Sequence, residues 1–118
     1  MRSVRALAAV PLVAALAAAG PAASSHPSTT PTPVKVVMTD YAFALSKQKI
    51  THGKATFRIV NVGEVVHDFK INGKKTPYYN NGQGGALSVA FKKPGRYAFI
   101  CTVPGHLAAG MKGVLIVR

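Results

Sequence analysis

The sequence predicts an all-β domain, built as an antiparallel sandwich or barrel of about seven strands. Short segments rich in β-branched and aromatic residues recur over residues 34–118. Turn-forming clusters of Gly, Asn and Pro separate these segments, and none of them sustains the apolar period of a helix. Many short strands with turn signals between them are typical of antiparallel sandwiches and barrels.

Seven segments are expected to form these strands. The first is a short apolar run, and the next two mix aromatic and β-branched residues in partial alternation. Four more continue the series, and the Gly-rich turn NNGQGG at residues 80–85 is expected to be a mobile loop. In chain order, the expected strands are VKVVM (34–38), YAFAL (41–45), KATFRIV (54–60), VVHDFKI (65–71), ALSVAF (86–91), RYAFIC (96–101) and GVLIV (113–117).

The N-terminal segment differs in composition from the rest of the chain. Arg2 and Arg5 precede a short apolar run that ends in small residues, which is the pattern of a secretory signal peptide over residues 1–19. The run is too short to span a bilayer comfortably, which takes about 20 residues. Residues 20–33, rich in Pro, Ser and Thr, are expected to be a flexible linker. We therefore expect the folded domain, residues 34–118, to be exported to the periplasm, the cell surface or the medium, without stable membrane insertion after cleavage.

The chain is strongly basic. Its 15 Lys and Arg residues against 3 Asp and Glu residues give a formal net charge of +12 at pH 7. The cations are scattered along the sequence, which indicates a solvated surface and favours acidic partners. Nucleic acid is not expected as a partner, because an exported protein rarely meets it and no helix interleaves basic with aromatic residues.

Cys101 is the only cysteine, which excludes an internal disulfide and any metal site with two cysteine ligands from one chain. It ends an expected strand, and His106 and Met111 follow in a loop rich in Gly and Pro that can turn tightly. Thiolate, imidazole and thioether are soft ligands that together select copper. A blue copper centre uses two histidines, one cysteine and a distant methionine, so this loop offers three of the four.

The second histidine must come from elsewhere in the chain. His67, in EVVHDF, follows a turn at the head of an expected strand, from which it can reach the same end of a sandwich as the cysteine loop. His52 lies in a turn and is expected to be simply exposed, while His26 lies in the linker and is expected to be solvated. Met38 is expected to fill the core.

Taken together, these residues make the chain resemble a cupredoxin, a small type 1 (blue) copper protein of the plastocyanin and azurin kind. The stretch VKVVMTDYAFALSKQKITHGKATFRIVNVGEVVHDFKI resembles the first half of such a domain, and RYAFICTVPGHLAAGMKGVLIV resembles the second half. The C-x4-H-x4-M spacing is similar to that of auracyanin- and rusticyanin-like members. The resemblance implies a Greek-key β-sandwich of about seven to eight strands.

The resemblance also implies one copper ion per chain, with His67, Cys101 and His106 as equatorial ligands and Met111 as the weak axial ligand. Asp68 stands where family members often have Asn or Ser. That position normally braces the cysteine loop by hydrogen bonding, so Asp68 is expected in the second layer around the metal.

A docking patch for redox proteins is implied around the ring edge of His106. Its expected members are Pro104, Leu107, Ala108 and Ala109, with Lys112 nearby to steer an acidic partner. The protein is then expected to be a monomeric electron carrier and not an enzyme, because the sequence shows no acid–base pair and no further cofactor motif.

Three other interpretations stay open. The protein could deliver or store copper outside the cytoplasm, although exported copper carriers tend to use several exposed Met and His residues. Cys101 could be an inert core residue in a cupredoxin-like scaffold. Cys101 and His106 could also be a nucleophile and its base, but no residue is obviously placed to orient the histidine.

Overall fold

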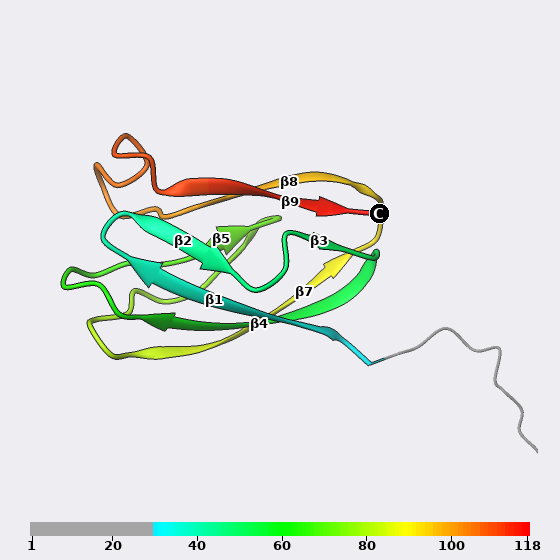
Figure 1. The fold of residues 1–118 in the computed structure, drawn as a ribbon, viewed down its shortest axis with the longest axis horizontal. Helices are drawn as coiled ribbons and strands as arrows, with labels where there is room; N and C mark the ends of the chain where they lie inside the picture. Colours follow the sequence, from blue (N-terminus) through cyan, green and yellow to red (C-terminus); the bar gives the residue numbers. More distant parts are fainter. Residues whose placement is uncertain (1–29) are drawn as a thin grey trace, which may run out of the picture.

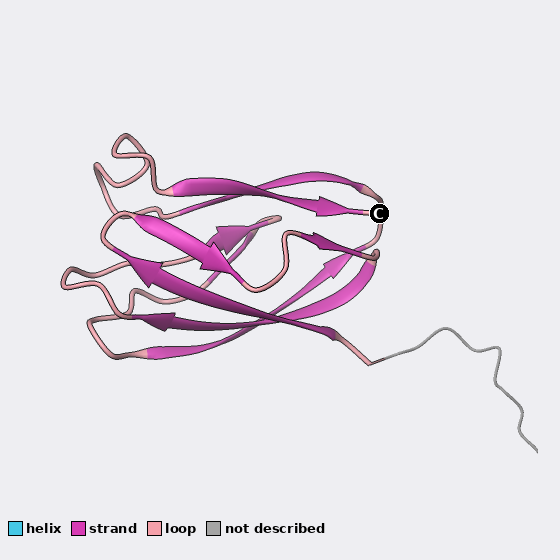
Figure 2. Cartoon of the chain, in the orientation of Figure 1, coloured by secondary structure: helices cyan, strands magenta, loops and turns pink. Residues whose placement is uncertain are grey.

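The computed structural model describes residues 30–118, which form nine strands in two sheets (Figure 1 and Figure 2). The two sheets pack face to face, so the predicted all-β sandwich is confirmed, with nine strands where about seven to eight were expected. The expected purely antiparallel pairing is wrong, because each sheet contains one parallel pair of strands. No helix within residues 30–118 is long and apolar enough to cross a membrane.

The first sheet has the order β2–β1–β4–β7, with the two central strands parallel to each other. Alternate side chains of its first strand, from Val34 to Met38, are buried, because every second residue of a strand points to the same face. That strand begins at Thr32, two residues before the expected start. Pro33 is tolerated there because β2 pairs only with the far half of β1, so no partner on that side needs its N–H. The four strands are β2 (Ala42–Leu45), β1 (Thr32–Thr39), β4 (Gly53–Asn61) and β7 (Gly84–Phe91).

The second sheet has the order β3–β9–β8–β5–β6. Its centre is the antiparallel pair β8–β9, and three two-residue strands extend it on both sides. The short strands carry too little pattern to be recognised in the sequence, and two of them, β3 and β6, were not expected. The five strands are β3 (Lys49–Ile50), β9 (Lys112–Val117), β8 (Gly95–Ile100), β5 (Lys70–Ile71) and β6 (Lys74–Lys75).

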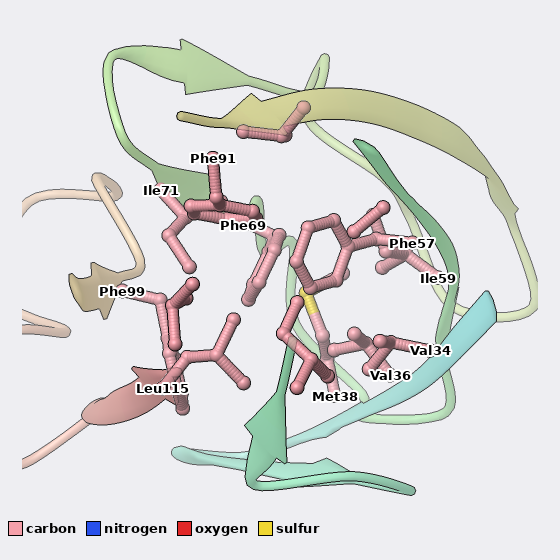
Figure 3. Close-up of a cluster of buried hydrophobic side chains, with 14 of the residues drawn as sticks. Val34, Val36, Met38, Phe57, Ile59, Phe69, Ile71, Phe91, Phe99 and Leu115 are labelled. Atoms are coloured by element: carbon pink, nitrogen blue, oxygen red, sulfur yellow. The ribbon is translucent and has the colours of Figure 1, made fainter. Parts of the chain in front are cut away.

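The core lies between the two sheets and is rich in aromatic rings (Figure 3). Phe69 is at its centre, with ring centroids 5.2 to 5.5 Å from those of Phe43, Phe57 and Phe99. Burying a side chain of this size contributes about 1.5–3 kcal/mol. The core therefore gives the loops at each end of the sandwich a firm base.

The segment 65–71 departs most from the expected strand pattern. Only its last two residues form a strand, and His67 is instead joined to Tyr79 by an isolated bridge. His67 and Asp68 are both fully buried, so the polar side chains that break the apolar alternation face inward and bond to other loops.

The expected mobile loop at residues 80–85 is shorter than predicted. Its last two residues, Gly84 and Gly85, belong to β7 and pair with β4. A Cβ on Gly84 would overlap the carbonyl oxygen of Ile59, so glycine is needed here for close strand packing rather than for mobility.

One end of the sandwich collects the loops that matter for the site. The β1–β2 turn, the β4–β5 loop and the β8–β9 loop lie together on the left of Figure 1, opposite the C-terminus. This arrangement brings His67 beside Cys101 and His106, although 34 and 39 residues separate them in the sequence.

Candidate metal centre

Three side chains converge at this end of the sandwich: His67, Cys101 and His106. Their ligand atoms all lie within 4.8 Å of one another. The sulfur of Cys101 is 3.9 Å from Nδ1 of His67 and 3.5 Å from Nδ1 of His106, and the two Nδ1 atoms are 3.1 Å apart. Both histidines thus turn the same ring nitrogen toward the sulfur, as ligands of one ion would.

His67 is fixed through both its backbone and its ring. Its N–H donates to the carbonyl of Tyr79 at 3.1 Å, and its carbonyl accepts from the N–H of Tyr79 at 2.8 Å. The side chain is fully buried, and its Nε2 lies 2.8 Å from Oδ1 of Asp40. A carboxylate can only accept a hydrogen bond, so Nε2 carries the proton and Nδ1 keeps its lone pair on the side of Cys101.

Asp40 is ionised in this arrangement. The hydrogen bond from His67 holds the pKa of the Asp40 carboxyl below its ordinary value, and the backbone N–H groups of Glu64 and Val65 lower it further. These N–H groups donate to the carboxylate at 3.0 and 3.3 Å. The sequence analysis did not single out Asp40.

Cys101 directly follows β8 and is 1% exposed. Burial raises the pKa of its thiol, although the backbone N–H groups of Asp68 and Val103 pull in the opposite direction. The metal-free thiol is therefore protonated at neutral pH. A coordinated metal ion removes that proton, since a metal-bound thiol is deprotonated.

Asp68 links the two halves of the site. It follows His67 in sequence, and its carboxylate accepts from the backbone N–H of Thr102 at 2.6 Å and from the Thr102 hydroxyl. Thr102 in turn follows Cys101. The nearby Lys75 ammonium, 3.2 Å from Oδ2, balances the charge of this fully buried carboxylate.

The loop of residues 102–110 returns to the sheet through Met111. The backbone N–H of Met111 donates to the carbonyl of His106 at 3.1 Å, and the carbonyl of Met111 accepts from the N–H of Cys101 at 3.2 Å. Met111 is fully buried. Gly105 and Gly110 adopt φ angles of +87° and +97°, which other residues enter only with strain, so the tight turns of this loop depend on glycine.

His106 is the one converging side chain that stays partly exposed. Its pKa is lowered by desolvation and by the neighbouring His67, which keeps the ring neutral and its nitrogens able to bind metal. Tyr41 packs its ring edge against both imidazoles, with centroids 5.0 Å from His106 and 6.0 Å from His67. Tyr41 is 43% exposed and was also missed by the sequence analysis.

The other predicted residues fall in different places. His52 lies at the opposite end of the sandwich, where its Nδ1 is 2.9 Å from the carbonyl oxygen of Arg118. Met38 is buried in the core, and His26 lies outside the described residues. The expected docking residues are all exposed in or just after the loop that carries His106: Pro104, Leu107, Ala108, Ala109 and Lys112.

The donor set fits copper. A thiol and two imidazole nitrogens converge within a few ångströms, and a thioether residue closes the same loop. Soft sulfur combined with imidazole is the ligand chemistry of blue copper sites. The carboxylate behind His67 is also typical of metal-bound histidines, whose second ring nitrogen usually donates to such a group.

Comparison with known proteins agrees with this donor set. Residues 30–118 match the copper binding proteins of the plastocyanin/azurin family. A stretch of 42 residues, 36% of this chain, is 48% identical to auracyanin-B of Chloroflexus aurantiacus, and it spans 18% of that protein's length.

Solved structures show the same fold. A structure of auracyanin B has a TM-score of 0.67 and 26% identity, covering 75% of this chain and 91% of that chain. Auracyanin from Roseiflexus castenholzii has a TM-score of 0.64 at 20% identity, covering 74% of this chain and 97% of that chain.

Proposed function

Since the chain belongs to the plastocyanin/azurin family of copper-binding proteins, we propose that it is an exported, monomeric electron carrier with one copper ion per chain. His67, Cys101, His106 and Met111 hold the ion in this proposal. The bound copper supplies a one-electron Cu(II)/Cu(I) couple. The protein passes electrons between other redox proteins and transforms no substrate itself.

One observation carries the proposal: a buried thiol and two imidazole Nδ1 atoms point at one another across 3.1 to 3.9 Å. The sulfur and the two ring nitrogens are all atoms that bind metal ions through lone pairs. Here they come from two distant segments and converge on one point. A shared cation satisfies all three at once.

The surroundings of these residues suit electron transfer. Backbone and carboxylate hydrogen bonds tie the segment of His67 to that of Cys101, and both rest on the packed core. Ligands held this firmly move little when the charge at the centre changes, which keeps the energetic cost of each electron transfer low.

An exposed apolar rim lies at the same end of the sandwich as the partly exposed His106 (Figure 1) and supports a docking role. Several of its side chains are more than a third exposed, and they come from three different loops at this end of the molecule. Transient electron-transfer complexes use small contacts that separate quickly. We define the apolar rim by these residues: Tyr41, Val62, Val65, Pro104, Leu107, Ala108 and Ala109.

Charges near the apolar rim favour an acidic partner only modestly. Lys112 is exposed beside Met111 and carries the steering charge. The three acidic residues of the described chain also lie at this end, but Asp40 is bonded to His67 and Asp68 to Lys75. Glu64 is thus the one carboxylate of residues 30–118 that opposes Lys112, and the association rate should fall as salt is raised.

The export part of the proposal rests on residues 1–19, which lie outside the described residues. Expression in a bacterial host with an export pathway, followed by N-terminal sequencing of the extracytoplasmic protein, tests it. Loss of about the first 19 residues is expected. A protein that keeps its N-terminus and stays in the cytoplasm would contradict export.

The copper site is tested by adding one equivalent of Cu(II) to the purified protein and to Cys101→Ser. An intense blue band with a small copper hyperfine splitting, absent from the variant, is expected. Met111→Leu and Met38→Leu form a matched pair, since both methionines are fully buried but only Met111 adjoins the site. Only Met111→Leu should shift the reduction potential.

Two outcomes would count against the proposal. Weak colour with an ordinary copper signal and rapid loss of copper to a chelator would favour copper delivery or storage instead. Absence of any copper signal would show that the assignment of the four ligands is wrong.

A further inference from the structure

We propose that Asp40 is a positioning residue for the copper site, which fixes the ring orientation and tautomer of His67 and lowers the reduction potential. The inference rests on the proposed function, because it assigns His67 to the metal. It concerns a residue 27 positions away from His67 in sequence, in a turn that carries no metal-ligand motif.

The carboxylate of Asp40 joins two loops through three donors. Oδ1 accepts from Nε2 of His67 at 2.8 Å and from the N–H of Val65 at 3.3 Å, while Oδ2 accepts from the N–H of Glu64 at 3.0 Å. The two backbone donors keep the carboxylate in one orientation. The ring of His67 then meets a fixed acceptor and not a freely rotating side chain.

Both sides of this contact are anchored to the first sheet. The parallel pairing of β1 with β4 sets Met38 beside Asn61, which places the β1–β2 turn next to the loop that leads to His67. The fully buried amide of Asn61 donates to the carbonyls of Val65 and Tyr79 at 2.9 and 2.7 Å. Asp40 therefore acts from a rigid base.

Gly63 shows how closely the loop backbone packs against Asp40 and His67. A Cβ at this position would overlap Oδ1 of Asp40 and would lie 2.9 Å from Nε2 of His67. The loop backbone thus passes directly over the hydrogen bond. Little room remains for the carboxylate or the imidazole to adopt another position.

The chemical consequence follows from the hydrogen-bond direction. With its proton held on Nε2, His67 presents the lone pair of Nδ1 toward Cys101, which is the form a metal ion requires. The negative charge on the far side of the ring also favours the more highly charged Cu(II) over Cu(I). His106 has no such acceptor for its Nε2 among residues 30–118, so only one histidine is held in this way.

The charge is tested with Asp40→Asn, which keeps the shape and an acceptor oxygen for Nε2 of His67 but loses the oxygen that accepts from the N–H of Glu64, and with Glu64→Gln as matched control. The control removes the same charge from an exposed side chain that makes no hydrogen bond or salt bridge within residues 30–118. Asp40→Asn should weaken Cu(II) binding about tenfold more than Cu(I) binding. This raises the one-electron potential by about 59 mV. Equal shifts in the two variants would overturn the electrostatic role.

The positioning is tested without copper, by ¹⁵N NMR of the histidine rings in the metal-free protein. His67 should be the pure Nε2–H tautomer in the wild type and in Asp40→Asn, and a mixture of tautomers in Asp40→Ala. A pure Nε2–H form in a folded Asp40→Ala would overturn the positioning role. This measurement decides the role of Asp40 even if the wild type fails to bind copper, a result that would refute the proposed function separately.

Discussion

The two histidines of the site come from regions that are built in opposite ways. The segment of residues 61–68 buries His67 and Asp68 and is held by the Asp40 side chain from another turn and by its own buried Asn61. The loop of residues 102–110 is mostly exposed and is held by hydrogen bonds within its own backbone. The first region fixes the position of a ligand, and the second brings a ligand to the surface.

The difference separates two requirements that one region could not meet alone. A ligand that must not move needs buried contacts on all sides, which leave no path for a partner. A ligand that must approach a partner needs an exposed loop, and loops on a firm scaffold are where binding residues usually lie. The hydrogen bond between Asp68 and Thr102 joins the two regions, so the loop that carries His106 is still attached to the rigid segment around His67.

Removal of each histidine ring should show the largest difference between the two regions. His106→Gly opens a gap at the surface that added imidazole can enter, whereas His67→Gly leaves a cavity closed off from solvent. We expect both variants to lose the blue band, and only His106→Gly to regain it in millimolar imidazole. Titration followed by visible absorption measures this, and equal recovery in both variants would contradict the comparison.

Alanine substitution of one glycine in each region should have the next largest effect. Gly63→Ala inserts a methyl group against Asp40 and His67, and overpacking of this kind costs up to about 3 kcal/mol. Gly105→Ala meets no atom within 4 Å and suffers only from its φ of +87°, at a cost of about 1 kcal/mol. Urea unfolding of the metal-free variants gives both values, and a larger loss in Gly105→Ala would contradict the assignment of the rigid region.

Neutralising Asp68 tests the link between the two regions. Asp68→Asn can keep an oxygen for the N–H of Thr102, but it removes the charge from the fully buried side chain and places an amide donor beside the Thr102 hydroxyl and the Lys75 ammonium. The expected loss of stability is about 2 kcal/mol. Lys75→Gln is the control for the ion pair, because the Lys75 side chain is 45% exposed and water can partly replace its contact with the buried carboxylate, so a smaller loss is expected. Similar losses in both variants would mean that the ion pair, and not Thr102, matters.

The same contrast explains what the sequence could reveal. Cys101, His106 and Met111 are neighbours in sequence, so their spacing alone indicated the loop, and the strand patterns indicated the sandwich. Asp40 is different, because its contact with His67 depends on the register between β1 and β4, which no local pattern specifies.

Errors in the predicted strands have a related cause. The segment 65–71 has the composition of a strand, but its polar residues His67 and Asp68 satisfy their hydrogen bonds with other loops and not with a neighbouring strand. Local propensity was overridden there by tertiary contacts, at the point where the site is built.

The smallest expected difference between the two regions is in how their stability responds to acid. In the metal-free protein the pKa of His106 lies below its ordinary value because of burial and the nearby His67, and the pKa of Asp40 lies below its own because of the His67 hydrogen bond. In both cases the unfolded chain binds its proton at a higher pH than the folded protein does. Stability therefore falls as the pH drops, first below about 6.5 for His106 and then below about 3.9 for Asp40.

Thermal unfolding of the metal-free protein between pH 8 and pH 3 measures these two steps. His106→Gln should remove the upper step and leave the lower one, and Asp40→Asn should do the reverse. The exposed loop would then respond to mild acid, while the buried region around His67 keeps its carboxylate bond until the pH falls much further. A single step that both variants abolish would show that the two regions titrate as one unit, and the division drawn between them would be wrong.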